Sequence, residues 1–550
     1  MMSSLVLLGT TGNWVNVWLT PLWLLGVGTL AGLVLLLVLW GLAFVLSRVP
    51  LIGGSTDPAK STSTGASGSS IGYWLFRPIQ VLFSRQTVAE IPMAVREGAL
   101  WPIFLTAVSV AAFGIVGAMF VQDPVGLLAS LTRLPAVGTT TLPPFQIPVS
   151  QLEDPDDPFS ELEAHRIPVS IKVEELRSLT FESDQRLSVA SRPFLDVRPG
   201  ASLEVNAGEE TTWRRSPGDV NPMIDEDVSE LFIRNLGSDT ANLNLTIVTE
   251  PPDPEVAIIP IVAVLVAIVF LLYIWQRAVA PRMSAIALAA YKSEVAQPLF
   301  AILLVLGLFA LWFFIWIPYN TFGEDIKMLK DAGLVLIRIL GIILAVWAAS
   351  NSIADEIEGR TALTVLSKPI GRRSFVMGKF LGIVWLVTVL FVFLGLMLLV
   401  VVAYKPIHES REGATMDLTW QLCHLEMVYT LPGLALMFME TVVMAAISVA
   451  ISTRLPLLAN FILCLGIYLI GHLTPLIVNS AIGQLVPVQF FGQFVATVFP
   501  NLDHFDIQAA VAAGLPVPLL YLAVALVYCI LYTVIAMLLA LVLFEDRDLA

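Results

Sequence analysis

The 550-residue sequence has little charge and very few cysteines. Asp, Glu, Lys and Arg make up 13% of the residues, hydrophobic types make up 57%, and mean hydropathy is +0.82. Soluble domains carry about a quarter charged residues, so this composition indicates a protein that crosses a membrane several times. Three cysteines are too few for a disulfide framework, and two of them lie in apolar runs, so neither redox nor zinc chemistry is indicated.

Positive charge is also scarce. With 30 Lys and Arg against 44 Asp and Glu, the net charge is −14, which leaves no basic surplus for nucleic acid. The sequence contains no G-x-x-x-x-G-K-[ST] phosphate loop, no G-x-S-x-G, no H-E-x-x-H and no C-x-x-C pair, and its five histidines lack the spacing of a helical metal pair. We therefore expect no catalytic activity, no cofactor, no metal site and no nucleic-acid partner.

Long apolar runs are what the sequence does contain. A membrane-spanning helix needs about 20 mostly apolar residues. Nine runs meet this requirement: 22–46, 100–121, 256–275, 298–318, 332–351, 376–403, 430–453, 457–478 and 519–543. Residues 1–21 contain no Lys or Arg, so we expect the first run to remain as an anchor rather than to act as a signal peptide.

The basic residues predict the orientation. Outside residues 122–255, most of them lie in the loops between the first and second, third and fourth, and fifth and sixth runs. The short opposite loops hold only Lys327, Lys330, Lys405 and Arg411. Cytoplasmic loops carry an excess of Lys and Arg, so we expect a multi-pass protein of the inner or plasma membrane with its N-terminus outside and its C-terminus in the cytoplasm.

Residues 122–255 form an acidic segment that differs from the rest of the chain. They hold 24 acidic and 10 basic residues, a sum of −14, so the remainder of the chain is neutral. A Pro-rich tether is followed by alternating apolar segments, and a turn rich in Asn, Gly and Asp between 230–234 and 242–248 predicts a β-hairpin. We expect an extracytoplasmic β-sandwich of roughly 90 residues, either an inert spacer or a docking surface for an envelope partner.

Two cytoplasmic segments have a mixed aromatic, aliphatic and basic composition. Residues 71–77 and 86–96 follow a Gly/Ser/Thr-rich linker, Gly53 to Ser70, and are typical of helices that lie in the membrane interface. Residues 283–297 have a similar character and lead directly into the fourth run.

The segment from Asn351 to Gly382, between the fifth and sixth runs, is the most informative. Its amphipathic start and Pro369, which must end or bend a helix, also fit an ordinary basic inside loop. Its residues in order, however, resemble the cytoplasmic loop of ABC-2-type transporter permeases: Glu356 and Glu358, Gly359-Arg360-Thr361, Leu366-Ser-Lys-Pro-Ile370, Arg372 and Arg373, and Gly378-Lys379-Phe-Leu-Gly382.

The resemblance extends over about half the chain. Residues 283–297 are similar to the elbow helix that precedes the first core span of that family. Residues 499–505 (Phe-Pro-Asn-Leu-Asp-His-Phe) are similar to the segment before its last span, and 543–549 are similar to its C-terminal end. Three N-terminal spans and the acidic segment precede this core and depart from the family pattern.

The resemblance implies the membrane subunit of an ABC exporter whose ATPase is a separate chain. Two permeases, identical or different, and two ATPases would form the exporter, with loop 352–379 docked into the ATPase. The residues implied in ATPase coupling are Asp355, Glu356, Glu358, Gly359, Arg360, Thr361, Lys368, Pro369, Arg372, Arg373, Gly378 and Lys379. The alternative is a non-transporting scaffold or mechanotransmission subunit that acts on envelope partners; an ion-coupled secondary transporter is disfavoured because the sequence shows no internal repeat.

Four parts of the chain follow from these patterns. They are an N-terminal two-span segment (1–121), the acidic β-rich domain (122–255), a third span with its connector (256–282) and a six-span permease core (283–550).

Ionisable residues within the runs are few: Arg338 lies in the fifth run, Glu440 in the seventh and His472 in the eighth. A charge at the bilayer centre costs about 2.5–3.5 kcal/mol on insertion scales, so each needs a partner or a water-filled path. We expect Arg338 to pair with Glu440, in one chain or across a dimer, with His472 in the same layer. The pair would either fix the packing of the core helices or belong to a substrate pathway.

Overall fold

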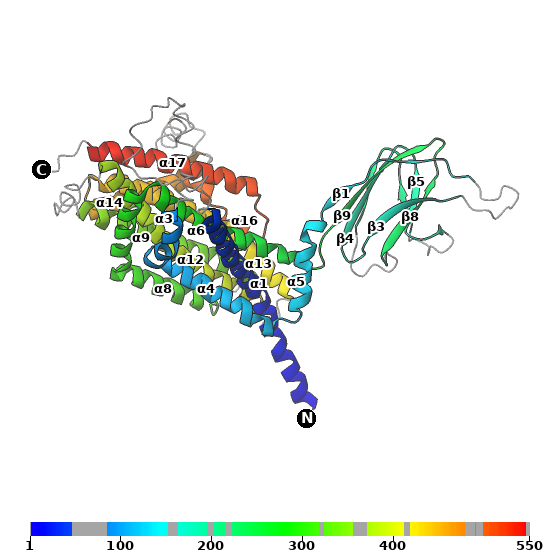
Figure 1. Cartoon of the computed structure of the whole chain (residues 1–550), viewed down its shortest axis with the longest axis horizontal. Coiled ribbons are helices and arrows are strands. Elements are labelled where there is room, and N and C mark those ends of the chain that lie inside the picture. Colours follow the sequence, from blue (N-terminus) through cyan, green and yellow to red (C-terminus); the bar gives the residue numbers. More distant parts are fainter. Residues whose placement is uncertain are drawn as a thin grey trace. The chain divides into compact units, whose positions relative to one another are not determined.

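The structure is a computed structural model that describes residues 2–46, 85–151, 163–194, 202–214, 223–317, 324–355, 371–411, 418–478, 490 and 499–545. The chain divides into two compact units. One is Gln122–Ile258, and the other combines Met1–Val121 with Ile259–Ala550. The first unit is built mainly of strands and the second of helices (Figure 1).

The helices of the second unit are α1 (Met2–Leu46), α3 (Arg85–Glu97), α4 (Trp101–Val116), α6 (Ile258–Val279), α7 (Pro281–Val295), α8 (Pro298–Phe314), α9 (Asp325–Ala349), α12 (Arg372–Arg411), α13 (Trp420–Ser452), α14 (Leu457–Val478), α16 (Gln508–Ala512) and α17 (Leu519–Glu545). Helices α3, α7 and α16 lie between the apolar runs of the sequence, and the others coincide with them. Short 3₁₀ turns follow α4 (η1, Gly117–Phe120) and precede α16 (η7, Leu502–Phe505), and α9 continues into a π-helical turn, η5 (Ser350–Asp355).

The chain is a multi-pass membrane protein, but the count of nine spans is not confirmed. Seven helices among the described residues are long and apolar enough to cross a membrane, or eight if the bent pair α7 and α8 counts as one span. The predicted run 298–318 is the second half of that pair, and the run 457–478 contributes only a shorter apolar helix, Leu457–Leu473.

The bend between α7 and α8 has a local cause. The two helices meet at an angle of 67°. Pro298 is the first residue of α8, and Gln297 before it is extended, with φ −74° and ψ 142°. A proline disfavours the helical conformation in the residue that precedes it, so the chain must turn at this point. Helix α7 corresponds to the elbow-like segment 283–297 of the sequence.

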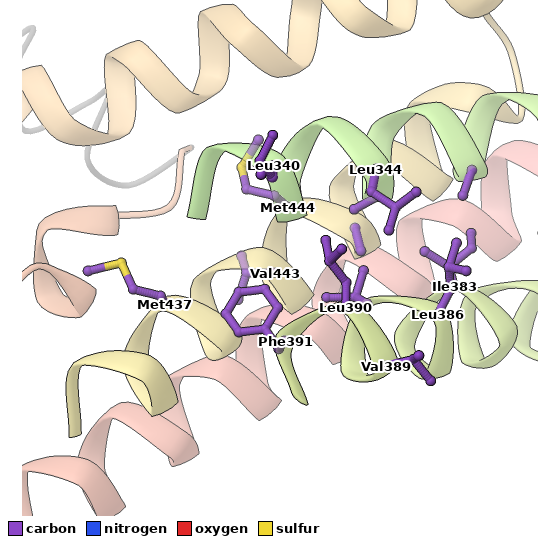
Figure 2. Packing of buried hydrophobic residues seen from close by; sticks show 14 of the residues in the cluster. Leu340, Leu344, Ile383, Leu386, Val389, Leu390, Phe391, Met437, Val443 and Met444 are labelled. Carbon is purple, nitrogen blue, oxygen red and sulfur yellow. The ribbon is translucent and has the colours of Figure 1, made fainter. Parts of the chain in front are cut away.

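Three helices, α9, α12 and α13, form the centre of this unit. Their buried aliphatic and aromatic side chains belong to one continuous cluster. Figure 2 shows Leu344 of α9 directed toward Leu386 and Leu390 of α12, with Val443 of α13 beside Phe391. This apolar packing holds the polar residues described below in fixed positions, because the helices that carry them cannot shift without opening the cluster.

The N-terminal helices α1 and α4 pack through glycines. Added Cβ atoms on Gly26 and Gly114 would lie 2.5–2.9 Å from the backbone of the opposite helix, which is closer than a side chain permits. Trp23 of α1 donates its indole N–H to the carbonyl oxygen of Gly114, at 2.8 Å. Small residues at a helix crossing let backbones approach closely, and this arrangement joins the first two spans tightly.

The unit Gln122–Ile258 consists of two antiparallel sheets. Its strands are β1 (Thr139–Thr141), β2 (Phe145–Ile147), β3 (His165–Ile171), β4 (Leu176–Ser183), β5 (Leu187–Ala190), β6 (Leu203–Val205), β7 (Glu210–Arg214), β8 (Val228–Asn235) and β9 (Ala241–Thr249). One sheet has the order β1-β9-β4-β7, with β2 also on β9, and the other has the order β3-β8-β5-β6. Helix α5 (Pro124–Arg133) and the 3₁₀ turns η2 (Leu134–Ala136) and η4 (Pro254–Ala257) complete the unit.

Alternation along the strands explains the core of this unit. In β9 the buried residues are Ala241, Leu243, Leu245 and Ile247, every second position. They share one hydrophobic cluster with apolar residues of both sheets, including Leu231 and Ile233 of β8. A strand directs alternate side chains to opposite faces, so each sheet buries one face and exposes the other.

The predicted hairpin between 230–234 and 242–248 is wrong. Both segments are strands, β8 and β9, but they belong to different sheets and do not pair with each other. The turn instead crosses between the sheets: Asn235 donates its side-chain N–H groups to the carbonyl oxygens of Ile147 and Asp239, at 3.0 and 2.8 Å. These bonds favour an arch, and the alternating pattern that suggests a hairpin is the same for either arrangement.

Candidate functional site

Most of the predicted ATPase-coupling residues lie outside the described residues. These are Glu356, Glu358, Gly359, Arg360, Thr361, Lys368 and Pro369, within 356–370. Asp355 is the last residue of the π-helical turn η5, and Arg372 begins α12. The structure therefore describes the two ends of the loop, and their contacts determine which helices a movement of the loop would reach.

The upstream end of the loop carries a buried polar network. Asn460 of α14 donates its side-chain N–H groups to the hydroxyl oxygens of Ser350 and Ser448, at 2.7 and 2.8 Å, and Cys464 lies 3.3 Å from its side-chain oxygen. Ser350 begins η5, and π-helical turns are frequent at functional sites. The network joins η5, α13 and α14 at the point where the loop leaves the membrane unit.

Gln297, at the bend between α7 and α8, is bonded to the same end of the loop. Its side-chain oxygen accepts N–H groups from the indole of Trp347 at 3.0 Å and from the amide of Asn351 at 2.8 Å. Asn351 lies in η5, so the bend of the elbow and the start of the loop are connected by one amide group. A displacement of η5 must break these bonds or move α7.

The downstream end of the loop is connected to the last helix. Arg372 donates to the carbonyl oxygen of Glu545 at 2.9 Å, and Arg373 lies 3.9 Å from the Glu545 carboxylate. The ion pair is largely exposed, so its contribution to stability is small. The aromatic contact beneath it is firmer: the rings of Phe375 and Phe544 stack with centroids 5.8 Å apart, and both are fully buried.

Gly378 and Lys379 are placed inside the unit. A Cβ atom on Gly378 would lie 2.8 Å from Cβ of Ile286, and one on Gly382 would lie 2.6 Å from the carbonyl oxygen of Ala287. Lys379 is 7% exposed, with its ammonium nitrogen 5.6 Å from the ring of Phe375. In this structure the two glycines serve the close packing of α12 on α7, because only glycine leaves room for the elbow backbone.

The three intramembrane ionisable residues of the sequence analysis lie together. Arg338 Nη1 is 3.6 Å from Glu440 Oε2, and His472 Nε2 is 3.5 Å from Glu440 Oε1, all within one chain. They come from α9, α13 and α14, and Glu440 is fully buried. The expected pair is thus present, and the expected place of His472 in the same layer agrees with the structure.

A fourth member of this cluster, Asp506, is absent from the sequence analysis. Its Oδ2 lies 3.3 Å from Arg338 Nη1 and accepts a hydrogen bond from it. Asp506 follows η7 in the segment before α17 and lies outside every apolar run, so a search for charges within runs misses it. The signal that could have found it is its place directly after the family-like segment 499–505.

Two lysines assigned to outer loops lie inside the unit, which corrects the sequence analysis. Lys330 is a residue of α9, fully buried, and pairs with Glu426; Lys405 is a residue of α12, and its ammonium lies 3.2 Å from the carboxylate of Asp325. Helices α9, α12 and α13 therefore extend beyond the apolar runs 332–351, 376–403 and 430–453. The runs end at the first charges, whereas the helices continue because those charges are paired within the bundle.

The arrangement offers ion pairs and helix connections rather than a metal centre. Among the described residues, no group of three or more His, Cys, Asp or Glu side chains is placed to hold a metal ion. The three cysteines are buried and belong to α13, α14 and α17. The chemistry that the described part of the chain supports is conformational: charged and polar contacts join the elbow, the loop ends and the last helix.

Comparison with known proteins agrees with the order of these elements. A family model described as ABC-2 family transporter protein matches residues 261–549. The match begins inside α6, so the third N-terminal span, which the sequence analysis placed before the core, belongs to the matched region. A search of the curated proteins gives no match to the chain.

Proposed function

Because the chain belongs to the ABC-2 family of transporter proteins, we propose that it is the membrane-spanning permease of an ATP-driven exporter. A permease of this family works with an ATPase subunit in general. This sequence carries no phosphate loop, and in this proposal the ATPase is a separate chain. Two permeases, as a homodimer or a heterodimer, and two ATPases form the complete exporter.

The observation that carries this proposal is the pair of connections at the ends of loop 352–379. Upstream, Asn351 is bonded to Gln297 at the elbow bend, and downstream Arg372 is bonded to Glu545 at the end of α17. A partner that pushes on the loop therefore acts on α7 and α17 at once. Loop 352–379 is the coupling element, and its acidic residues Glu356 and Glu358 face the ATPase.

Charge placement supports the orientation of this arrangement. The excess of Lys and Arg in the corresponding loops supports a cytoplasmic position for the loop ends, with the N-terminus outside and the C-terminus inside. The unit Gln122–Ile258 then faces the outside. Its two antiparallel sheets with one shared core form a β-sandwich, which acts either as a spacer or as a docking surface for an extracytoplasmic partner.

The test is charge reversal in the loop. Glu356→Lys with Glu358→Lys should abolish stimulation of the partner ATPase in proteoliposomes, while the amount of inserted permease stays unchanged, because like charges then oppose docking. The matched control is Glu90→Lys with Glu97→Lys on α3, two exposed acidic residues predicted on the same side of the membrane.

Three outcomes are distinguishable. Loss of stimulation in the loop variant alone supports the coupling role. Wild-type stimulation in both variants contradicts it. Stimulation by the wild type without movement of any cargo across the vesicle membrane favours the scaffold function over the exporter.

A further inference from the structure

Glu440 is a buried carboxylate without a hydrogen-bond donor. The residue is 0% exposed, and neither of its carboxylate oxygens has a hydrogen-bond partner among the described residues. Its nearest cationic group, Arg338 Nη1, lies 3.6 Å away, beyond hydrogen-bond distance. A buried, unbonded carboxylate is costly, and the part of the site that the structure describes supplies no donor for it.

A neutral His472 side chain presents a hydrogen-bond acceptor, rather than a donor, to the Glu440 carboxylate. Its Nδ1 lies 3.1 Å from the carbonyl oxygen of Tyr468. A carbonyl oxygen can only accept, so Nδ1 carries the hydrogen, and in the neutral imidazole Nε2 is then an acceptor. Nε2 lies 3.5 Å from Glu440 Oε1 and has no donor of its own among the described residues. Two acceptors thus face each other in a buried place.

The charged groups around Glu440 and His472 are mostly negative. Arg338 is the cation that faces both Glu440 and Asp506, so one positive charge serves two carboxylates. Asp331 of α9 and Asp503 of η7 add negative potential nearby, and the ring of Tyr468 lies 5.9 Å from the Arg338 guanidinium carbon. The sequence from 474 to 498 contains no ionisable residue that could supply a further cation.

We propose that Glu440 and His472 bind one proton between them, taken from water on the side where Asp506 is exposed. A single hydrogen placed between Nε2 and Oε1 turns one of the two acceptors into a donor for the other and makes the set Arg338, Glu440, His472 and Asp506 neutral overall. The proton is taken up without any other bond forming or breaking. This site is independent of the coupling loop and of the identity of the cargo.

The presence or absence of the proton determines whether Arg338 pairs with Glu440 or with Asp506. With the proton bound, Glu440 needs no further cation, and Arg338 bonds to Asp506. In this structure Arg338 Nη1 lies 3.3 Å from Asp506 and 3.6 Å from Glu440. When the proton leaves, the fully buried Glu440 competes for the guanidinium. The side chain of Asp506 is 28% exposed, so water can hydrate it instead, and its hydrogen bond with Arg338 breaks.

Release of Asp506 loosens a defined segment. Asp506 lies between η7 and α16, and the side-chain nitrogen of Gln508 in α16 lies 3.9 Å from the sulfur of Met437 in α13. Lys330 also donates to the carbonyl oxygen of Val511, at 3.3 Å, and Leu502, Phe505 and Val511 are fully buried. Loss of the proton therefore loosens the segment 502–512 around Asp506 and Gln508, while its apolar contacts remain. The contact of this segment with α13 is therefore sensitive to pH: it is kept when the proton is bound and weakened when the proton is lost.

A cross-link across this contact tests the proposal. Met437→Cys and Gln508→Cys are introduced into the full-length protein in lipid vesicles, and the fraction joined by a short bifunctional thiol reagent is measured from about pH 5 to about pH 9, the range that brackets histidine titration. Each measurement is repeated with Glu440→Gln and with His472→Gln. Glu440→Gln supplies a donor and removes the negative charge, so the segment should stay docked at every pH. His472→Gln supplies a donor but leaves Glu440 charged and removes the imidazole that shares the proton, so docking should no longer change across the histidine range.

The expected result is a loss of cross-linking in the parent protein as the pH rises and a constant fraction in both amide variants. Comparison at each pH cancels the intrinsic pH dependence of the thiol reaction. Glu409→Gln, a buried carboxylate of α12 that accepts the backbone N–H of Ile326 and lies outside the cluster, is the control and should lose cross-linking as the parent does. A constant fraction in the parent, or the same loss in Glu440→Gln and His472→Gln as in the parent, would overturn the proposal.

Discussion

Arg338 serves two carboxylates, Glu440 and Asp506, and this sharing determines the effect of each substitution. Removing one member of a buried charge pair leaves the other uncompensated and costs about 3–5 kcal/mol. The fully buried Glu440 is therefore more sensitive than the partly exposed Asp506. The role of the pair in holding the core helices closed stays a prediction.

Charge swapping tests that role. Arg338→Glu and Glu440→Arg should each lower the thermal midpoint of the full-length protein in detergent or abolish its assembly, because each leaves like charges in contact. The double variant should recover part of the loss, and Asp506, which keeps its negative charge, prevents full recovery. A double variant no more stable than the worse single variant would contradict a direct pairing.

Asp184 gives a pH-dependent prediction for the strand unit. Its carboxylate accepts the backbone N–H and the side-chain N–H of Asn242, at 2.8 and 2.7 Å. These hydrogen bonds lower the pKa of Asp184 below its ordinary value. A lowered pKa in the folded state means that the stabilisation is present above the ordinary pKa and disappears as the pH falls through the lowered one.

The measurement is a comparison of thermal midpoints with Asp184→Asn. Near neutral pH the variant should unfold at a slightly lower temperature than the parent, because the charged acceptor is lost. As the pH falls below the carboxylate range, the two midpoints should converge. A difference that is constant from neutral to acidic pH would show that the charge of Asp184 is irrelevant.

At the scale of elements, the positions of the helices could be predicted from the sequence better than the residues at which they end or the residues that pair with their buried charges. Apolar runs gave the positions of α9, α12 and α13, because burial in a membrane requires apolar residues over a whole span. The charged turns at Lys330 and Lys405 could not be assigned to helices from the sequence. Glu426 and Asp325 pair with these lysines and offset the free-energy cost of burying their charges. Each partner is distant in sequence and lies near its lysine only in the folded bundle.

The strands show the same limit. Alternation identified β8 and β9, but not the sheet to which each belongs, since the pattern reports one buried face and says nothing of the neighbouring strand. In the candidate site, the pair of Arg338 and Glu440 was predictable from cost and depth. Asp506 and the network around Asn460 could not be predicted, because no pattern in the sequence distinguishes these residues from other polar residues.

The packing of α12 on the elbow helix α7 yields a prediction at this scale. Gly382→Ala places a Cβ atom 2.6 Å from the carbonyl oxygen of Ala287, so the helices must separate. Overpacking of this kind costs about 1–3 kcal/mol. Gly466→Ala on α14 is the control, because its Cβ would meet no atom within 4 Å.

Thermal unfolding of the two variants should therefore differ in sign. Gly382→Ala should lower the midpoint, and Gly466→Ala should leave it unchanged or raise it, because alanine is the better helix former. Equal midpoints for the two variants would show that α7 and α12 can part without cost.

At the scale of the whole molecule, the two units are expected to fold separately. The unit Gln122–Ile258 has its own hydrophobic cluster and both of its sheets, and it holds the acidic surplus of the chain. Expressed alone, it should give a strand-rich circular dichroism spectrum and melt cooperatively. A spectrum of a random coil, with no melting transition, would mean that the sheets depend on the membrane unit.

The membrane unit and its family give the central claim, a permease driven by a separate ATPase. Its most direct measurement is native mass spectrometry of the full-length protein released from membranes that also contain the candidate ATPase. The account predicts a complex of two permeases and two ATPases, which dissociates when Glu356→Lys and Glu358→Lys are introduced. A permease that carries no ATPase, under conditions in which its own dimer survives, would contradict the account.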